Sequence, residues 1–274
     1  MRTWVNGTIV EAAESLVSVF DHGFTVGDGV FETTKVVDGT PFALSRHLLR
    51  LQSSARGLGL PDPDLDLVRH AVTDVLLEND TTEPLRLRIT YTGGVSPLGS
   101  DRGDSAPTLV VAIAPLKVWA PTAQLATVPW PRNESAPTAG LKTTSYADNV
   151  IALAYAKARG ASEAVLANTA GHLCEGTGSN VFVVLGGQIA TPPLSSGCLA
   201  GVSRALVLEW IGGEERDLPM TVLRDAEEIF LTSATRDIQA VQRVDDRVLP
   251  LAPGPVTQRA AEVFAKRAAD DLDP

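Results

Sequence analysis

Two residues in the middle of the chain have the types and surroundings to do covalent chemistry. Lys142 lies in Gly-Leu-Lys-Thr-Thr-Ser-Tyr, residues 140–146, and Glu175 begins Glu-Gly-Thr-Gly-Ser-Asn, residues 175–180. A lysine amine among small hydroxyl residues can form a Schiff base with an aldehyde. A carboxylate among glycines can keep the nitrogen of a pyridine ring protonated. The two groups together can anchor an aromatic aldehyde and keep its ring electron-poor.

Neither residue is informative by itself, because a single lysine is usually solvated and Glu-Gly usually belongs to a turn. Their combination is what the chemistry of pyridoxal 5'-phosphate (PLP) requires: one covalent anchor and one group that keeps the ring an electron sink. We therefore predict that PLP is the cofactor. Lys142 is predicted to be catalytic and cofactor-binding, and Glu175 to be cofactor-binding.

A phosphate group needs backbone N–H donors and a cation, and the sequence offers candidates for both. Residues 199–204, Leu-Ala-Gly-Val-Ser-Arg, lead into a predicted helix whose N-terminus presents free N–H groups to an anion. Residues 232–235, Thr-Ser-Ala-Thr, close a predicted strand with residues small enough for a backbone nest. Arg50 stands among leucines, either as a phosphate ligand or as a surface arginine whose stem packs on apolar neighbours.

Composition limits the other classes of function. The chain has 274 residues, 44% of them hydrophobic and 20% charged, which suffices for a large core. Its formal net charge of -10 disfavours nucleic-acid binding, which needs a basic face. Cys174, Cys198 and the four scattered histidines show no spacing typical of metal sites or disulfide frameworks, so no metal is predicted. No apolar run or leader suggests a membrane protein, and we expect a cytoplasmic one.

The pattern of elements predicts a two-domain α/β protein. Turns at Asn6-Gly7 and Asp38-Gly39 each predict a hairpin. Ser45 is predicted to cap the helix that follows it, and residues 270–274 are predicted to be a frayed tail. We expect a smaller N-terminal domain over residues 1–114, an interdomain loop over 115–122, and a larger C-terminal domain over 123–274 that carries Lys142. Further helices are predicted over residues 64–77, 148–159 and 201–211, and strands over 85–91, 108–113, 164–167, 181–185, 188–191 and 228–232.

Taken in order, these motifs resemble the fold-type IV PLP enzymes, the class-IV aminotransferase family. That family includes D-amino-acid transaminases, branched-chain aminotransferases, R-selective amine transaminases and 4-amino-4-deoxychorismate lyases. The resemblance covers nearly the whole chain and rests on these segments: Asn6-Gly7, Gly27-Asp-Gly29 with Phe31-Glu32, residues 47–51, Lys142, Glu175 to Phe182, Gly201-Val-Ser-Arg204 and Thr232-Ser-Ala.

The resemblance implies two α/β lobes with the cofactor between them, and a homodimer in which a neighbouring subunit completes the site. Lys142 would form the Schiff base and later shuttle the proton, and Glu175 would pair with the ring nitrogen. The remaining cofactor contacts implied by the resemblance are Arg50, Val202, Ser203, Ser233 and Ala234 at the phosphate, Leu199 on one ring face, and Tyr146 at the phenolic oxygen. Branched-chain members place that tyrosine one residue further from the lysine.

Departures from the family pattern bear on the substrate. Val26 stands where branched-chain members usually have tyrosine, and Thr33 stands where they have the glycine of Phe-Glu-Gly, which disfavours that activity. The segment from Gly27 to Phe31 follows the pattern of the D-amino-acid and lyase branches. The Arg-x-His carboxylate trap of typical D-amino-acid transaminases is missing here. The predicted substrate-binding set is therefore Phe31, Val26 and Thr33, with Arg86, Arg88 or Arg102 as the carboxylate ligand.

The leading hypothesis is a PLP-dependent transaminase that passes an amino group from D-amino acids, with some tolerance of R-amines, to a 2-keto acid. One alternative is a 4-amino-4-deoxychorismate lyase that releases pyruvate and 4-aminobenzoate. A second alternative is a branched-chain L-amino-acid aminotransferase. A PLP-binding scaffold without activity is disfavoured, since both Lys142 and Glu175 are present.

Overall fold

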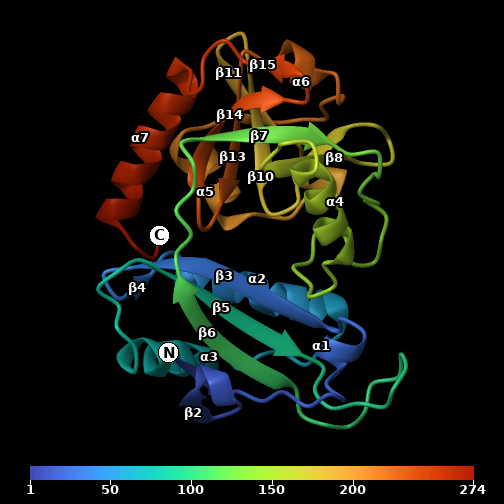
Figure 1. Ribbon diagram of the computed structural model, residues 1–274, viewed down its shortest axis with the longest axis vertical. Coiled ribbons are helices and arrows are strands. Elements are labelled where there is room, and N and C mark those ends of the chain that lie inside the picture. The colour runs from blue at the N-terminus through green and yellow to red at the C-terminus, as the bar shows by residue number, and fades with distance from the viewer. The chain divides into compact units, whose positions relative to one another are not determined.

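The computed structural model describes residues 1–274, which divide into two compact units (Figure 1). Unit 1 comprises Met1–Lys117, Leu141–Tyr146 and Leu272–Pro274, and unit 2 comprises Val118–Gly140 and Ala147–Asp271. The change from unit 1 to unit 2 falls inside the predicted interdomain loop. The segment that carries Lys142 belongs to unit 1, whereas the sequence placed it in the C-terminal domain. The reason is backbone hydrogen bonding between this segment and a strand of unit 1.

Unit 1 is built on a six-stranded antiparallel sheet with the strand order β2-β1-β6-β5-β3-β4. The predicted hairpin turns are confirmed: Asn6, Gly7, Asp38 and Gly39 all have positive φ, a conformation that these residue types tolerate. The strands are β1 (Arg2–Val5), β2 (Thr8–Glu11), β3 (Gly29–Val37), β4 (Thr40–Pro41), β5 (Leu85–Thr92) and β6 (Thr108–Pro115).

Helices α2 (Leu44–Leu58) and α3 (Leu65–Leu77) supply buried side chains to the core of this sheet (Figure 1). The short elements η1 (Ala12–Glu14) and α1 (His22–Thr25) precede β3. Alternation along β5 buries Leu87 and Ile89 in the same core and places Arg86 and Arg88 on the opposite face. This opposite face is the one that matters for the site described below.

The start of α2 differs from the prediction. Ser45 was expected to cap the helix, but the helix begins at Leu44 and Ser45 lies within its first turn. The backbone N–H and the hydroxyl of Ser45 instead donate to the carboxylate of Asp273, at 2.7 and 2.5 Å. The N–H of Ala43 donates to the carbonyl oxygen of Leu272 at 2.6 Å. The predicted frayed tail therefore caps α2, a role that local sequence did not reveal.

Unit 2 is built on a nine-stranded mixed sheet with the order β12-β11-β10-β13-β14-β7-β8-β9, and β15 pairs with β14. Its strands β7 and β8 run parallel to their neighbours in the series β14-β7-β8, and β9 returns antiparallel to β8. The bounds are β7 (Thr122–Thr127), β8 (Glu163–Ala167), β9 (Leu173–Gly176), β10 (Asn180–Leu185), β11 (Gln188–Thr191), β12 (Glu214–Glu215), β13 (Glu228–Ser233), β14 (Asp237–Val244) and β15 (Arg247–Val248).

The helices of unit 2 are α4 (Ala147–Lys157), α5 (Val202–Trp210), α6 (Val222–Asp225) and α7 (Pro255–Asp270), with the single turn η2 (Leu194–Ser196). The predicted helices over residues 148–159 and 201–211 are confirmed as α4 and α5. Helix α7 was not predicted. The N–H groups of Val256 and Thr257 in its first turn donate to the buried carboxylate of Glu228, at 3.0 and 2.7 Å. No helix in the chain is both long enough and apolar enough to cross a membrane.

Candidate active site

Lys142 lies in an extended segment beside β3. Its carbonyl oxygen accepts a hydrogen bond from the N–H of Phe31 (3.0 Å), and its own N–H donates to Oγ of Ser54 (3.2 Å). The N–H of Thr144 donates to the carbonyl oxygen of Gly29 (2.7 Å). A side chain at Gly29 would place Cβ only 3.0 Å from a carbonyl oxygen of β5, so this close approach requires glycine. The lysine backbone is therefore fixed at both ends.

The amine of Lys142 is directed at an aromatic wall. Its Nζ lies 4.4 Å from the ring centroid of Phe31 and 5.9 Å from that of Tyr146. The two rings meet edge to face, with their centroids 5.1 Å apart. Aromatic faces attract cations and exclude water, so these rings restrict where the amine lies. The predicted contact of Tyr146 with a phenolic oxygen stays a prediction.

The guanidinium of Arg88 and the amine of Lys142 both lie close to the ring of Phe31. The guanidinium carbon of Arg88 lies 3.8 Å from the centroid of Phe31, and its Nε donates to Oγ1 of Thr90 (3.1 Å). No carboxylate lies within ion-pair distance, and the terminal nitrogens of Arg88 donate to no acceptor in the chain. Burial lowers the pKa of Arg88 from its ordinary value, and the charge of Arg86 lowers it further. Across the strand pair, the hydroxyl of Thr33 is also buried without a partner.

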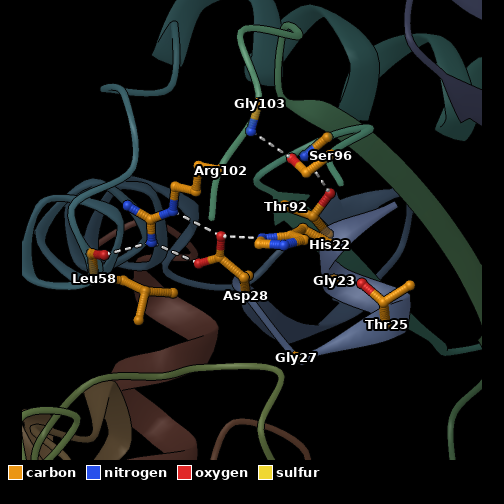
Figure 2. A network of polar contacts seen from close by, with 12 residues as sticks. His22, Gly23, Thr25, Gly27, Asp28, Leu58, Thr92, Ser96, Arg102 and Gly103 are labelled. Carbon is orange, nitrogen blue, oxygen red and sulfur yellow. Dashed lines mark hydrogen bonds and ion pairs between the residues drawn. The ribbon is translucent and has the colours of Figure 1, made fainter. Parts of the chain in front are cut away.

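Arg102, another predicted carboxylate ligand, is held by acceptors within unit 1. Figure 2 shows its guanidinium directed at Asp28, to which Nε and Nη2 donate at 2.7 and 2.6 Å. Two further N–H groups donate to the carbonyl oxygens of Leu58 and Gly59, each at 2.7 Å. Four of the five N–H groups of a guanidinium are thus used. Arg102 serves as a link between its loop and the end of α2.

The other side of Asp28 faces His22, whose Nδ1 lies 3.0 Å from the carboxylate (Figure 2). Burial opposes ionisation of Asp28, but hydrogen bonds from Arg102 and His22 hold the pKa of Asp28 below its ordinary value. His22 Nε2 lies 3.0 Å from the carbonyl oxygen of Gly99. The loop before β6 is therefore tied to the segment that carries Asp28, and Arg88 is left as the arginine available for a ligand near Lys142.

Arg50 lies in a buried cluster with Glu32 and His47. Its Nε and Nη2 donate to the two carboxylate oxygens of Glu32, at 2.8 and 2.7 Å, and Nδ1 of His47 lies 2.6 Å from the same carboxylate. Burial alone would raise the pKa of Glu32, but the charges and hydrogen bonds of Arg50 and His47 lower it to about 2. Arg50 is thus no solvated surface arginine. Its predicted contact with the cofactor phosphate stays a prediction.

We expect Glu32→Gln to lower the free energy of unfolding by about 3 kcal/mol, because it leaves the buried guanidinium of Arg50 without its charged partner. Since the folded-state pKa of Glu32 is about 2, below its ordinary value of 4.5, this contribution is complete above pH 4.5 and is lost as the pH falls toward 2. Urea titrations of both proteins at several pH values should show the difference shrinking in acid.

The matched control is Glu11→Gln. Glu11 pairs with Arg2 at the surface, where both side chains are about half exposed. Exposed ion pairs contribute little to stability, so this variant should unfold like the parent protein. A stability loss in Glu32→Gln that does not change with pH would contradict the stabilising role of the ionised carboxylate.

In unit 2, the carboxylate of Glu175 is held by an ion pair and a backbone hydrogen bond. Arg132 places Nε 3.3 Å from Oε1, and the N–H of Leu199 donates to Oε2 at 2.9 Å. The guanidinium of Arg132 also donates twice to Oδ1 of Asn149, both at 3.1 Å, and Nδ2 of Asn149 donates to the carbonyl oxygen of Thr177 (2.5 Å). Glu175 is nine-tenths buried and oriented by these partners, as a group that faces a ring nitrogen has to be.

The N-terminus of α5 and the end of β13 are neighbours in unit 2. Asn180 pairs with Thr232 across β10 and β13, and a Cβ at Gly201, the N-cap of α5, would lie 2.0 Å from Oδ1 of Asn180. The hydroxyls of Ser203, Thr232 and Ser233 are buried and have no hydrogen-bond partner in the chain. Unpartnered buried donors beside a helix N-terminus are the donor set that a phosphate group accepts from. The residues present therefore fit the phosphate of PLP.

The predicted residues fall into two sets, one in each unit. The set of unit 1 is Lys142, Tyr146, Phe31, Thr33, Arg50, Arg86, Arg88, Arg102 and Val26, and that of unit 2 is Glu175, Leu199, Val202, Ser203, Ser233 and Ala234. Of the first set, Val26 is exposed in the loop before β3, and Arg86 is exposed on β5. The sequence did not reveal Arg132 or Asn149, since neither belongs to a local motif and their partners lie far along the chain.

The amino-transferase class IV family model matches residues 29–244. A putative branched-chain-amino-acid aminotransferase of Methanocaldococcus jannaschii is 33% identical, over 96% of this chain and 95% of its own. A bifunctional aminodeoxychorismate lyase / D-amino acid transaminase of Mycobacterium tuberculosis is 31% identical, over 97% and 96%. The PLP-bound structure of a hypothetical aminotransferase from Mycobacterium tuberculosis has a TM-score of 0.90, with 28% identity over 99% of this chain and 100% of that one.

These relatives carry different substrate names, so family membership alone does not select among the D-amino-acid, branched-chain and lyase hypotheses. The predicted α/β fold, the PLP cofactor and the aminotransferase class are confirmed. The chain belongs to the class IV aminotransferases, which are PLP-dependent enzymes of fold type IV.

Proposed function

We propose that the protein is a transaminase that takes the amino group from D-amino acids and passes it to a 2-keto acid. The observation that carries this proposal is the guanidinium of Arg88, which shares the ring of Phe31 with the amine of Lys142 and has no carboxylate partner. A substrate that reacts at this amine and carries a carboxylate would supply the missing partner.

The cost of burying a charge explains why Arg88 points to a carboxylate substrate. A partly desolvated guanidinium is unfavourable unless it is paired, and burial already lowers the pKa of Arg88. Arginine binds carboxylates through two parallel hydrogen bonds, and both terminal nitrogens of Arg88 are available for them. An R-amine without a carboxylate would leave the charge unpaired, so we expect such amines to be poor donors.

The choice of D-amino acids rests on sequence features before β3 and at its start. Val26 and Thr33 replace residues of the branched-chain pattern, and Gly27 to Phe31 follows the D-type pattern. The similarity to the Mycobacterium tuberculosis enzyme supports D-amino acids and keeps the lyase reaction as the alternative. The similarity to the Methanocaldococcus jannaschii protein supports branched-chain L-amino acids as the second alternative.

Each residue then has a definite task. PLP, when bound, supplies the electron sink that lets a proton leave the α-carbon of an amino acid. Lys142 would hold the cofactor by its amine and carry that proton, while Glu175, oriented by Arg132, would face the ring nitrogen. The phosphate would be bound by the N–H groups at the start of α5 and by the hydroxyls of Ser203, Thr232 and Ser233.

The proposed function is tested by steady-state kinetics with a panel of amino donors. D-alanine and D-glutamate, with 2-oxoglutarate or pyruvate as acceptors, should react faster than L-leucine, the corresponding L-amino acids and (R)-1-phenylethylamine. A parallel assay should follow the release of 4-aminobenzoate from aminodeoxychorismate. Faster reaction with L-leucine than with every D-amino acid would select the branched-chain alternative, and release of 4-aminobenzoate without transamination would select the lyase.

Arg88→Ala should lower kcat/KM for D-alanine by about 10- to 100-fold, the usual loss for one hydrogen-bonded charged contact. The rate with (R)-1-phenylethylamine should not fall, because this donor has no carboxylate for Arg88 to bind. Arg86→Ala is the matched control, since Arg86 lies on the same face of β5 but is exposed. Equal losses with the amine and the amino acid would show that Arg88 does not recognise the carboxylate.

We also propose a homodimer, supported by an apolar surface of unit 1. The surface comprises Leu16, Val19, Phe20, Phe24 and Leu98, all of them exposed. Leu16, Val19 and Phe20 lie in the segment before α1, and Phe24 lies in α1. This segment adjoins the loop of Leu98, because the N–H of Ser96 donates to the carbonyl oxygen of Phe20. Exposed apolar patches of this kind mark protein interfaces. A molar mass of one chain by light scattering, at micromolar protein concentration, would contradict the dimer.

A further inference from the structure

A buried ion pair in unit 2 connects two segments that the proposed function assigns to the cofactor. Glu163, the first residue of β8, and Arg236, in the turn between β13 and β14, are almost entirely buried, and their Oε2 and Nη2 atoms lie 2.7 Å apart. Neither residue has a part in the chemistry proposed above. Their partners show what the pair holds together.

The carboxylate of Glu163 binds the loop that follows Glu175. Its Oε1 accepts hydrogen bonds from the backbone N–H of Thr177 (3.1 Å) and from the hydroxyl of the same residue, and its Oε2 accepts from Oγ of Ser179 (3.4 Å). Gly176 leaves room for this arrangement, because a Cβ there would lie 2.4 Å from Oγ of Ser179. Glu163 thus fixes the backbone directly after Glu175.

The guanidinium of Arg236 binds on the other side of the pair. Arg236 lies in the turn that carries Ser233, and its backbone N–H donates to the carbonyl oxygen of Ser233 at 3.2 Å. Its Nη1 donates to Oε1 of Gln239 (3.3 Å), and its guanidinium carbon lies 4.0 Å from the ring of Trp119. The side chain of Arg236 thus attaches the turn that contains Ser233 and Ala234 to Glu163, Gln239 and Trp119.

We propose that Glu163 and Arg236 are positioning residues, which fix the turn of Ser233 and Ala234 relative to the carboxylate of Glu175. This rests on the proposed contacts of that turn with the cofactor phosphate and of Glu175 with the ring nitrogen. The pyridine ring of PLP and its short CH2–O–P arm limit the distance between the ring nitrogen and the phosphate, so the affinity for PLP depends on the separation of the protein groups that meet these two points. The ion pair joins the two segments and sets that separation.

Stability by itself is a poor explanation for such a pair. Taking two charges out of water is costly, and replacing both partners of a buried ion pair by neutral groups is often neutral or stabilising. Removing one partner is destabilising, since the other charge stays buried. A positioning role and a stabilising role therefore predict different results when both partners are replaced together.

The experiment compares Glu163→Gln, Arg236→Met and the double variant. Each protein is stripped of PLP, its melting temperature is measured, and the dissociation constant of added PLP is determined by fluorescence. We expect both single variants to melt at lower temperature and the double variant to recover part of that loss. PLP affinity should be about tenfold weaker in all three proteins, and it should not recover in the double variant. Arg236→Lys, which keeps the charge, should fall between the parent and Arg236→Met.

The matched control is Glu228→Gln, which removes a buried carboxylate at the opposite end of β13. It should lower the melting temperature and leave PLP affinity unchanged, since the carboxylate of Glu228 accepts hydrogen bonds from the start of α7 and from no residue assigned to the cofactor. PLP affinity that follows the melting temperature through the whole series, or that never changes, would overturn the proposal. If the proposed contact of Glu175 with the ring nitrogen is wrong, this would be seen separately, as normal turnover in Glu175→Gln.

Discussion

Replacing Lys142 by alanine should give a folded protein that no longer attaches PLP covalently and has lost at least about 10³-fold of its transaminase activity, because both the anchor and the proton carrier are removed. The fold should survive, since the hydrogen bonds at Lys142 to Phe31 and Ser54 use only its backbone. The side chain contributes its amine, placed against the rings of Phe31 and Tyr146.

The attachment site can be found directly by borohydride reduction of the loaded protein and peptide mapping. The chain has five lysines, and the pyridoxyl group should be found on Lys142 alone. Lys35→Ala is the matched control, because Lys35 also lies in unit 1 with its amine over an aromatic ring, that of Phe42. This variant should keep both the adduct and the activity. An adduct on another lysine of the parent protein would refute the assignment.

Parts of the fold that depend on local chemistry could be predicted from the sequence. The turns at Asn6-Gly7 and Asp38-Gly39 require positive φ, and Asn, Asp and Gly tolerate that conformation, so the local sequence is enough to predict these turns. The helix α3 begins where Asp64 accepts hydrogen bonds from the N–H groups of its first turn. In each case the residues that interact are close neighbours in the sequence.

Other parts could not be predicted, because the partner lies far along the chain. Asp273 caps α2 in place of Ser45, and Glu228 caps α7 although more than a helix length of sequence separates them. Strand β9 is four residues long and includes a glycine, and it is a strand because β8 pairs with it. The proline at the start of α7 was a usable signal for that helix.

The candidate site likewise contains residues that the sequence could predict and residues whose role depends on distant partners. Lys142 and Glu175 stand in motifs with characteristic neighbours, so their types and order were enough to predict PLP. The choice of Arg88 over Arg102 required the structure, because it depends on which guanidinium already has a carboxylate partner. Asp28 occupies Arg102, and no sequence pattern distinguishes that pairing from an arginine that is available to substrate.

Glu175→Gln should keep PLP bound and lose turnover by about 10²-fold or more, the scale expected when one preorganised electrostatic contact is removed. The carboxylate now lies between the N–H of Leu199 and the guanidinium of Arg132. An amide can still accept from Leu199, but it presents N–H groups where Arg132 needs an acceptor. It also carries no charge to hold a proton on the ring nitrogen.

The retention of PLP in Glu175→Gln follows from the position of the other contacts. The hydroxyls of Ser203 and Ser233 and the amine of Lys142 do not depend on Glu175, so the dissociation constant should change much less than kcat. Glu134→Gln is the matched control, since Glu134 also binds local donors in unit 2, the N–H and hydroxyl of Thr169. It should leave kcat unchanged. Normal turnover in Glu175→Gln would mean that another group faces the ring nitrogen, and a loss of PLP equal to the loss of turnover would mean that Glu175 acts in binding alone.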